Sequence, residues 1–203
     1  MRKCLKRTGI CLLAACLIWT AMLVFDKRKL QNELIRLHVV AASDSPEDQA
    51  LKLRVRDAVV ESLQENMAKA VDRERAREYL EENLPKIESL ANRVLREAGC
   101  TDSVSVSLQK EEFPIRYYDT FALPSGIYDA LRITIGEGEG KNWWCVVFPT
   151  LCVGATVKEF GETARCAGLS DTLTETISAE NGYEVRFFIL DALGRLENFL
   201  HKG

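Results

Sequence analysis

The sequence predicts an α+β fold: a mainly antiparallel sheet packed by helices on one face, preceded by an N-terminal transmembrane or signal segment. Three observations predict it. An uncharged apolar run opens the chain, four segments alternate apolar and polar residues, and two long segments repeat apolar residues at helical spacing. The expected strands are 34–41, 103–109, 127–135 and 143–148, and the expected helices are mainly 46–68 and 72–98. Elements in this order fit a sheet with helices on one side.

The apolar run extends from Thr8 to Phe25. At about 1.5 Å per residue, its 18 residues span about 27 Å, enough for the core of a bilayer. Basic residues flank it on both sides: Arg2, Lys3, Lys6 and Arg7 before it, Lys27, Arg28 and Lys29 after it. Two interpretations stay open, a signal peptide or a signal-anchor that holds the protein in the membrane through residues 8–25. Either one divides the chain into segment 1–29 and one extracytoplasmic domain, 30–203.

The stretch from Ile35 to Val60 contains the first strand and the first long helix of this domain. Apolar residues alternate with Arg36 and His38, which is typical of a strand. Ser45 is placed as a helix N-cap, Pro46 follows at the first helical position, and Asp48 completes an S-x-x-D capping box. One buried helical stripe is then expected, formed by Leu51, Val55, Ala58, Val59 and Leu63.

The later elements are expected as follows. Pro85 starts a new helix within 72–98, and Gly99 ends it. The Gly-rich segment 136–142 joins two strands as a hairpin. Residues 34–152 form the core of the domain and 153–203 a looser part, in which Val185–Leu190 is a candidate strand before a short amphipathic helix at 190–200.

The charge of the domain excludes some partners. Segment 1–29 holds seven of the 27 basic residues and one of the 30 acidic ones, which leaves 20 basic and 29 acidic residues, a net charge of −9. This balance argues against nucleic acid, and against an anionic membrane surface, as partners of the domain. Contact with a membrane is therefore expected only through the N-terminal segment.

Cys145 and Cys152 bracket the sequence F-P-T-L, in which Pro149 turns the chain. Outside the cytoplasm they can form a disulfide, which would contribute about 2.5 kcal/mol in the chain-entropy model. The alternative is two small buried apolar side chains. Both interpretations stay open.

No pattern of catalytic, metal-binding or cofactor-binding residues stands out. The chain has two histidines, so a metal centre is not expected, and the loop at 136–142 matches neither a P-loop nor a dinucleotide fingerprint. No nucleophile motif is present either. The absence of a site favours a binding or signalling protein over an enzyme. Two alternatives remain: a cell-wall or small-ligand hydrolase that uses Cys145 or Asp44 and Asp48, and an anchored structural protein of the envelope.

Several polar and aromatic residues are not needed to explain the fold and are candidates for binding a partner. Trp143 and Trp144 are adjacent, so in a strand they face opposite sides and one of them needs a cover or a partner. The full candidate set is Arg36, His38, Asp44, Asp48, Arg54, Arg56, Asp57, Trp143 and Trp144.

Two long strings carry a resemblance to a known family. They are R-L-H-V-V-A-A-S-D-S-P-E-D-Q-A-L-K-L-R-V-R-D-A-V (36–59) and L-P-S-G-I-Y-D-A-L-R-I-T-I-G-E-G-E-G-K-N-W-W-C-V-V-F-P-T-L-C (123–152). With the N-terminal apolar segment, they resemble the stage II sporulation protein R family of endospore-forming bacteria. There are two departures: Ala42 stands where that family usually has Asn, and Ser125-Gly126 where it often has Ala-Gly.

The resemblance implies an exported signal and not an enzyme. Proteins of this family are made in the forespore and exported into the space between the forespore and mother-cell membranes. There they trigger a membrane-embedded aspartic protease, the sporulation sigma-E processing peptidase, which cleaves pro-sigma-E in the mother cell. The implied partner of this chain is therefore the extracytoplasmic part of that protease.

Overall fold

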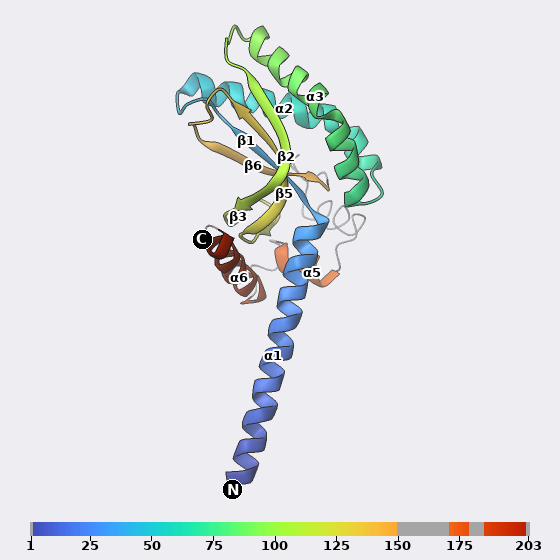
Figure 1. Ribbon diagram of the computed structural model, residues 1–203, viewed down its shortest axis with the longest axis vertical. Helices are drawn as coiled ribbons and strands as arrows, with labels where there is room; N and C mark the ends of the chain where they lie inside the picture. Colours follow the sequence, from blue (N-terminus) through green and yellow to red (C-terminus); the bar gives the residue numbers. More distant parts are fainter. Residues whose placement is uncertain (1, 150–170, 179–184, 202–203) are drawn as a thin grey trace.

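The computed structural model describes residues 2–149, 171–178 and 185–201, arranged as an α+β body at one end of a long helix (Figure 1). The helices are α1 (Arg2–Glu33), α2 (Pro46–Lys69), α3 (Arg73–Glu97), α5 (Asp171–Ile177) and α6 (Val185–His201). The strands are β1 (Ile35–Val40), β2 (Val104–Phe113), β3 (Arg116–Tyr117), β4 (Ala122–Leu123), β5 (Gly126–Ile135) and β6 (Asn142–Phe148). This confirms the predicted fold class.

The main sheet has four strands in the order β2-β5-β1-β6, and β3 and β4 form a separate pair. β2 and β5 are antiparallel, as are β1 and β6, whereas β1 and β5 are parallel. The sheet is therefore mostly antiparallel. The predicted hairpin of the last two strands is wrong, because β1 lies between them: Leu37 pairs with Leu131 on one side and with Cys145 on the other.

Helices α2 and α3 cover one face of this sheet (Figure 1). The main core lies beneath them, where Val55 and Leu80 of the helices meet Leu37 and Ile133 of the strands. All four side chains are fully buried. Burying an aliphatic side chain of this size contributes about 1.5–3 kcal/mol, so this layer supplies much of the stability of the body.

Helix α2 begins where the sequence predicts. Ser45 Oγ accepts a hydrogen bond from the backbone N–H of Asp48 at 3.1 Å, and Pro46 occupies the first turn. The second half of the capping box differs from the prediction. The N–H of Ser45 donates to Ser43 Oγ, and that hydroxyl donates to the Asp48 carboxylate, so Ser43 bridges the two groups.

Helix α3 runs through Pro85 without a break, so the predicted start of a new helix at Pro85 is wrong. Proline removes one hydrogen bond of the helix interior. The apolar stripe continues on the same side before and after it, from Leu80 to Ile87 and Leu95, and its burial outweighs that loss. Gly99 follows the helix with φ +75°, as predicted for a residue that ends it.

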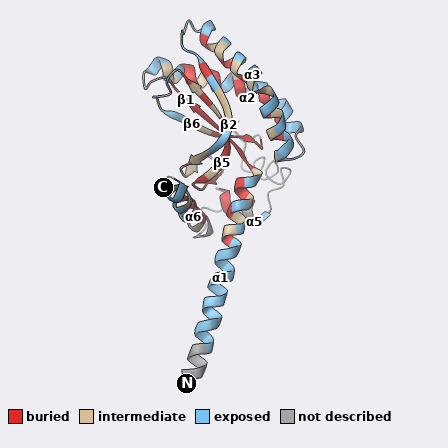
Figure 2. Cartoon of the chain, viewed as in Figure 1, coloured by how far each residue is buried: buried red, intermediate tan, exposed pale blue. Residues whose placement is uncertain are grey.

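The opposite face of the sheet is also covered at one end, which the sequence did not predict. A second apolar cluster there includes Leu30 and Leu34 near the end of α1, Phe113 and Tyr128 of the sheet, and Phe187 of α6. Figure 2 shows the change along α1, from exposed residues in the apolar run to buried residues at the body. The candidate strand at Val185–Leu190 is wrong, because these residues are the first turns of α6.

Candidate functional site

A buried polar network lies on the sheet face opposite α2 and α3, centred on His38 of β1. His38 Nδ1 is 2.7 Å from Glu111 Oε2, and Nε2 is 2.7 Å from Asn142 Oδ1. The ring stacks on Trp144 with 3.9 Å between centroids. Strand alternation places it here, because Leu37 and Val39 point into the main core on the other side. Its ring is held on three sides.

Glu111 of β2 joins this network to the partly exposed end of the sheet face. It accepts hydrogen bonds from Gln109 at 2.8 Å and from Arg132 at 3.0 Å, besides its contact with His38. Burial raises the pKa of the carboxyl, but the hydrogen bonds from His38, Gln109 and Arg132 together lower it to about 2. Glu111 therefore remains ionised at any physiological pH.

Arg36 lies deeper on the same face and is fully buried. Its Nη2 donates to the Tyr118 hydroxyl at 2.8 Å, and its guanidinium carbon lies 4.1 Å from the centroid of Phe113 and 5.0 Å from that of Tyr128. Its Nε and Nη1 have no hydrogen-bond partner among the described residues. Arg36 and His38, two of the candidates for binding a partner, are therefore both buried, because α1, α6 and the β3–β4 segment cover this end of the sheet.

Asp44 and Asp48 lie at the turn between β1 and α2, next to the loop that follows β5. Asp44 is exposed, and its Oδ1 accepts the backbone N–H of Lys141 at 2.7 Å. The buried Lys52 donates its Nζ to the Lys141 carbonyl at 2.9 Å, which ties the same loop to α2. These contacts account structurally for much of the polarity of the turn.

Three of the candidates form a patch on α2 and β6, which we call the α2–β6 patch and define as Arg56, Asp57 and Trp143. Arg56 lies over the Trp143 ring, 4.2 Å from its centroid, and its Nε donates to Asp57 Oδ1 at 2.8 Å. Trp143 remains 36% exposed, and Arg54 and Asp57 are exposed on α2. Trp144 faces the other side of the sheet, so the prediction that the two tryptophans point apart is confirmed.

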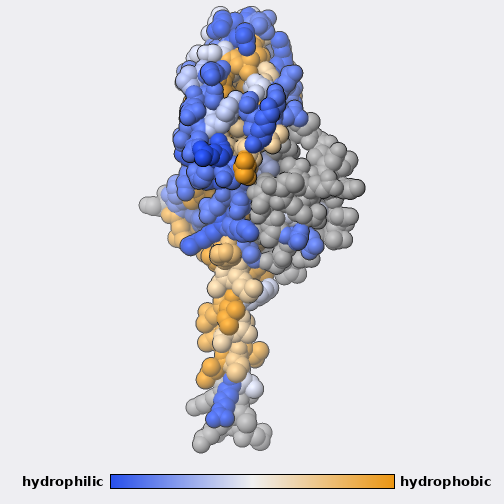
Figure 3. Space-filling view, turned by 90° about the vertical axis from the view of Figure 1, so that its right-hand side faces the viewer, coloured by the Kyte–Doolittle hydropathy of each residue, from blue (hydrophilic) through white to orange (hydrophobic). Residues whose placement is uncertain are grey.

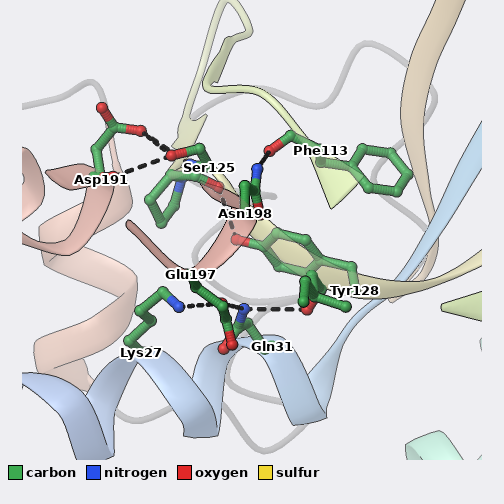
Figure 4. Close-up of polar contacts among 10 residues, drawn as sticks. Lys27, Gln31, Phe113, Ser125, Tyr128, Asp191, Glu197 and Asn198 are labelled. Carbon is green, nitrogen blue, oxygen red and sulfur yellow. Dashed lines mark hydrogen bonds and ion pairs between the residues drawn. The ribbon is translucent and has the colours of Figure 1, made fainter. Parts of the chain in front are cut away.

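A third group, which the sequence analysis missed, joins α1, β5 and α6 (Figure 4). Lys27 of α1 pairs with Glu197 of α6. Gln31 of α1 donates to the same carboxylate at 2.8 Å and to the Ile127 carbonyl at 3.0 Å. Burial raises the pKa of Glu197, but hydrogen bonds from Lys27 and Gln31 outweigh it and lower the pKa overall. This group fixes the end of α1 to the body.

The same junction contains a buried hydrogen-bonded pair between the start of β5 and α6. Ser125 Oγ donates to Asp191, 2.7 Å from Oδ1, and the Ser125 N–H donates to the same oxygen at 2.9 Å. A Cβ on Gly194 would lie 1.6 Å from the Ser125 carbonyl oxygen, so only glycine lets α6 approach this closely. Ser125 is one of the departures from the family pattern, and its hydroxyl has a defined partner in this chain.

Within the described part of the chain, these groups do not assemble a familiar catalytic or metal-binding set. Among the described residues no cluster of His, Cys, Asp and Glu could hold a metal ion. Cys145 is buried and disulfide-bonded, so its thiol is not available as a nucleophile. Its expected partner Cys152 lies outside the described residues, and that pairing stays a prediction.

The fold and these groups define a class: an α+β domain carried directly on an N-terminal helix that is long and apolar enough to cross a membrane. A family model described as Stage II sporulation protein R (spore_II_R) matches residues 31–158. The chain is also 33% identical over 185 residues to the Stage II sporulation protein R of Bacillus subtilis (strain 168), which covers 82% of this chain and 83% of the relative. The chain therefore belongs to the stage II sporulation protein R family. No solved structure matches it.

Some site residues could have been found from the sequence and others could not. The predicted strand 103–109 continues in the structure to Phe113. Extending the alternation past Gln109 would have placed Glu111 on the same face as Phe113. The contact between Lys27 and Glu197 spans 170 positions and carries no local signal. The roles expected for the nine candidate residues in binding a partner stay predictions.

Proposed function

We propose that this protein is an exported sporulation signal that activates a membrane-embedded aspartic protease, so that the protease processes pro-sigma-E in the mother cell. The observation that carries the proposal is the match over 82% of the chain to a Stage II sporulation protein R. The proposed route is export from the forespore into the intermembrane space, where the body meets the extracytoplasmic part of the protease.

The geometry supports a ligand better than a hydrolase. The buried and disulfide-bonded Cys145 leaves no free thiol at that position, and the Asp48 carboxylate accepts the Ser43 hydroxyl at the start of α2. The α2–β6 patch, by contrast, exposes a tryptophan ring against an arginine. Tryptophan and arginine are the residues that most often anchor protein interfaces.

Activation then requires that the body binds one state of the protease more tightly than another. Stabilising an active dimer of the protease is one such route. The α2–β6 patch is the surface through which we expect this contact, because the buried Arg36 and His38 reach a partner only indirectly.

The test is co-expression of this chain with the protease and pro-sigma-E in a host that does not sporulate. We expect processing only when all three proteins are present. Absence of processing from a chain that is stably exported would refute the activator role.

Substitution within the same assay tests the contact surface. Trp143→Ala should reduce processing at least tenfold, because anchors of this type cost about 2 kcal/mol or more when truncated. Arg93→Ala, an exposed change on α3, is the matched control and should process as the wild type does. If Trp143→Ala supports normal processing, the α2–β6 patch is not the contact surface. The activator role itself is tested separately, by the experiment with all three proteins.

A further inference from the structure

Helix α6 leaves a stripe of large apolar side chains uncovered. Phe188 is 53% exposed, Leu196 54%, Phe199 75% and Leu200 68%. At about 100° per residue these four side chains fall within about one third of the helix circumference. The opposite side of α6 is buried on the body through residues such as Phe187 and Leu190. The helix is thus apolar on both its packed and its outer face.

Helix α1 reaches the body without a spacer. Leu23, Lys27, Leu30 and Gln31 are buried at helical spacing, so contact with the body begins at Leu23. The apolar run ends only at Phe25, which is therefore two residues beyond the first contact. Figure 3 shows the apolar surface of α1 continuing up to the hydrophilic body. If α1 enters a bilayer through this run, the body lies directly on the bilayer surface.

The contacts of α6 place it at that same level. Glu197 pairs with Lys27, two residues after the end of the apolar run, which is about 3 Å along the axis of α1. Gln31, one turn further, holds the same carboxylate. Figure 1 shows α6 beside the body end of α1, at the side of the body that faces the apolar helix.

We propose that the stripe Phe188, Leu196, Phe199 and Leu200 of α6 inserts into the interfacial region of the membrane that α1 enters. The partner is the lipid surface itself. Apolar side chains of an amphipathic helix enter the boundary between headgroups and acyl chains, and the exposed Arg195 on the same helix can reach the headgroups. The contact fixes the orientation of the body on the membrane, and it does not depend on protease activation.

Lipid fits this stripe better than a second copy of the chain does. The end of α1 already brings the bilayer to within a few ångströms of Glu197, whereas nothing in the described structure brings a second copy there. The domain is acidic, so the apolar side chains and not charge drive the contact, and it forms with zwitterionic lipid. This refines the expectation that the body meets the membrane only through its N-terminal segment.

The test uses the full chain in phosphatidylcholine nanodiscs, with one tryptophan added at a time. Phe199→Trp reports on the stripe, and Glu97→Trp, at the last residue of α3, reports on the end of the body far from α1 (Figure 1). Subtracting the fluorescence of the wild-type chain from that of the variant gives the emission of the added tryptophan. Brominated acyl chains quench this emission on contact. Phe199 is exposed, so the change does not disturb the core.

We expect brominated lipid to quench the added emission of Phe199→Trp at least twofold and that of Glu97→Trp by less than a tenth. Bromines near the headgroups should quench Phe199→Trp more than bromines deep in the chains, whereas Trp19 within the apolar run should show the opposite order. Equal and weak quenching of both added tryptophans would overturn the proposal. An unquenched but blue-shifted Phe199→Trp would also overturn it and would indicate a contact between copies of the chain.

Discussion

At the scale of single residues, Glu111 is the point at which three hydrogen bonds of the sheet face meet. Glu111→Gln keeps the shape of the side chain but removes the charge that His38, Gln109 and Arg132 contact. We expect the free energy of unfolding at pH 7 to fall by about 1–3 kcal/mol, since hydrogen bonds to charged groups are the stronger ones. Chemical denaturation measures it, and the exposed Glu97→Gln is the control, which should change stability by less than about 0.5 kcal/mol.

The pKa of Glu111 gives the same variant a pH signature. The folded pKa of about 2 lies below the ordinary value of 4.5, so ionised Glu111 stabilises the fold above about pH 4.5. This contribution, at most about 3 kcal/mol, is lost as the pH falls from 4.5 toward 2. The difference in stability between the wild type and Glu111→Gln should therefore narrow over that range. A difference that stays constant down to pH 2 would show that the carboxylate is not held in this way.

Arg36 allows a test of whether a buried charge serves folding. Its Nε and Nη1 lack partners among the described residues, and Tyr118 keeps a hydrogen bond to the Trp144 carbonyl at 3.3 Å if the guanidinium is removed. Replacing a buried ion by an apolar side chain of similar volume is often neutral. We therefore expect the free energy of unfolding of Arg36→Met to lie within about 1 kcal/mol of the wild-type value. That of Arg36→Ala should be about 3 kcal/mol lower, because the smaller side chain leaves a cavity.

Equal losses for the two variants in chemical denaturation would contradict this and would make the charge itself necessary for the fold. If Arg36→Met is as stable as the wild type but fails in the processing assay, Arg36 serves signalling.

Residue-scale prediction from the sequence succeeded where a local pattern decides the outcome. Alternation placed His38 on the face opposite Leu37, and the cap at Ser45 followed from its neighbours. The sequence did not predict that Arg36 is buried, because its burial depends on α1 and α6, which come from the two ends of the chain. A strand pattern shows which face a side chain occupies but not what covers that face.

At the scale of elements, α3 is held to the sheet by a buried carboxylate on β5. Asp129 is 4% exposed, pairs with Arg73, and accepts Arg77 Nη1 at 3.0 Å. Asp129→Asn removes the buried anion that both arginines share, while Glu74 still pairs with Arg73 and Glu81 with Arg77. We therefore expect a loss of about 1.5–3 kcal/mol in unfolding free energy, the range for hydrogen bonds to charged groups. Thermal and chemical unfolding of the full chain measure it.

The control for this change is Asp57→Asn, because Asp57 is 65% exposed in its pair with Arg56. An exposed ion pair contributes at most about 1 kcal/mol, so the free energy of unfolding of this variant should lie within about 1 kcal/mol of the wild-type value. If the two variants lose equal amounts of stability, the pair between Asp129 and α3 does not hold the helix to the sheet.

Two of the three element-scale predictions that failed did so for physical reasons that one sequence does not contain. The Gly-rich loop between two strands matched a hairpin, but β1 pairs with both strands and separates them. The residues of a turn do not show that a strand from about 100 residues earlier in the chain will pair between the two strands that the turn joins. At Pro85 the rule for helix interiors predicted a new start, whereas packing of the stripe on both sides of it keeps α3 continuous.

At the scale of the whole molecule, the sequence predicted the fold class and the N-terminal helix, because both follow from composition and period. It did not predict how that helix joins the body. Leu23, Lys27, Leu30 and Gln31 form a buried stripe only when α6 and β5 lie beside them. The division after residue 29 was drawn from charge, but α1 continues to Glu33 and its last turns belong to the packed body.

The pair Lys27–Glu197 tests whether this junction sets the position of the body on its helix. Lys27→Glu or Glu197→Lys alone places like charges together, whereas the exchanged double variant restores opposite charges. We expect each single change to increase hydrogen exchange of the α6 amides in the full chain and the double variant to regain most of the protection. The coupling should be about 1–3 kcal/mol, because Lys27 is nearly buried and the other partner is 38% exposed.

The exposed pair Lys69–Glu65 on α2 is the matched control for that cycle, with both side chains more than two thirds exposed. Swapping the two charges of this pair in the same way should give a coupling energy below about 0.5 kcal/mol, as is usual for exposed helix pairs. A coupling at Lys27–Glu197 no larger than this would mean that apolar packing alone, through Leu23 and Leu30, docks the helix. A clear difference between the two pairs would mean that charge specifies how α6 packs against α1, and hence how the body is oriented on its N-terminal helix.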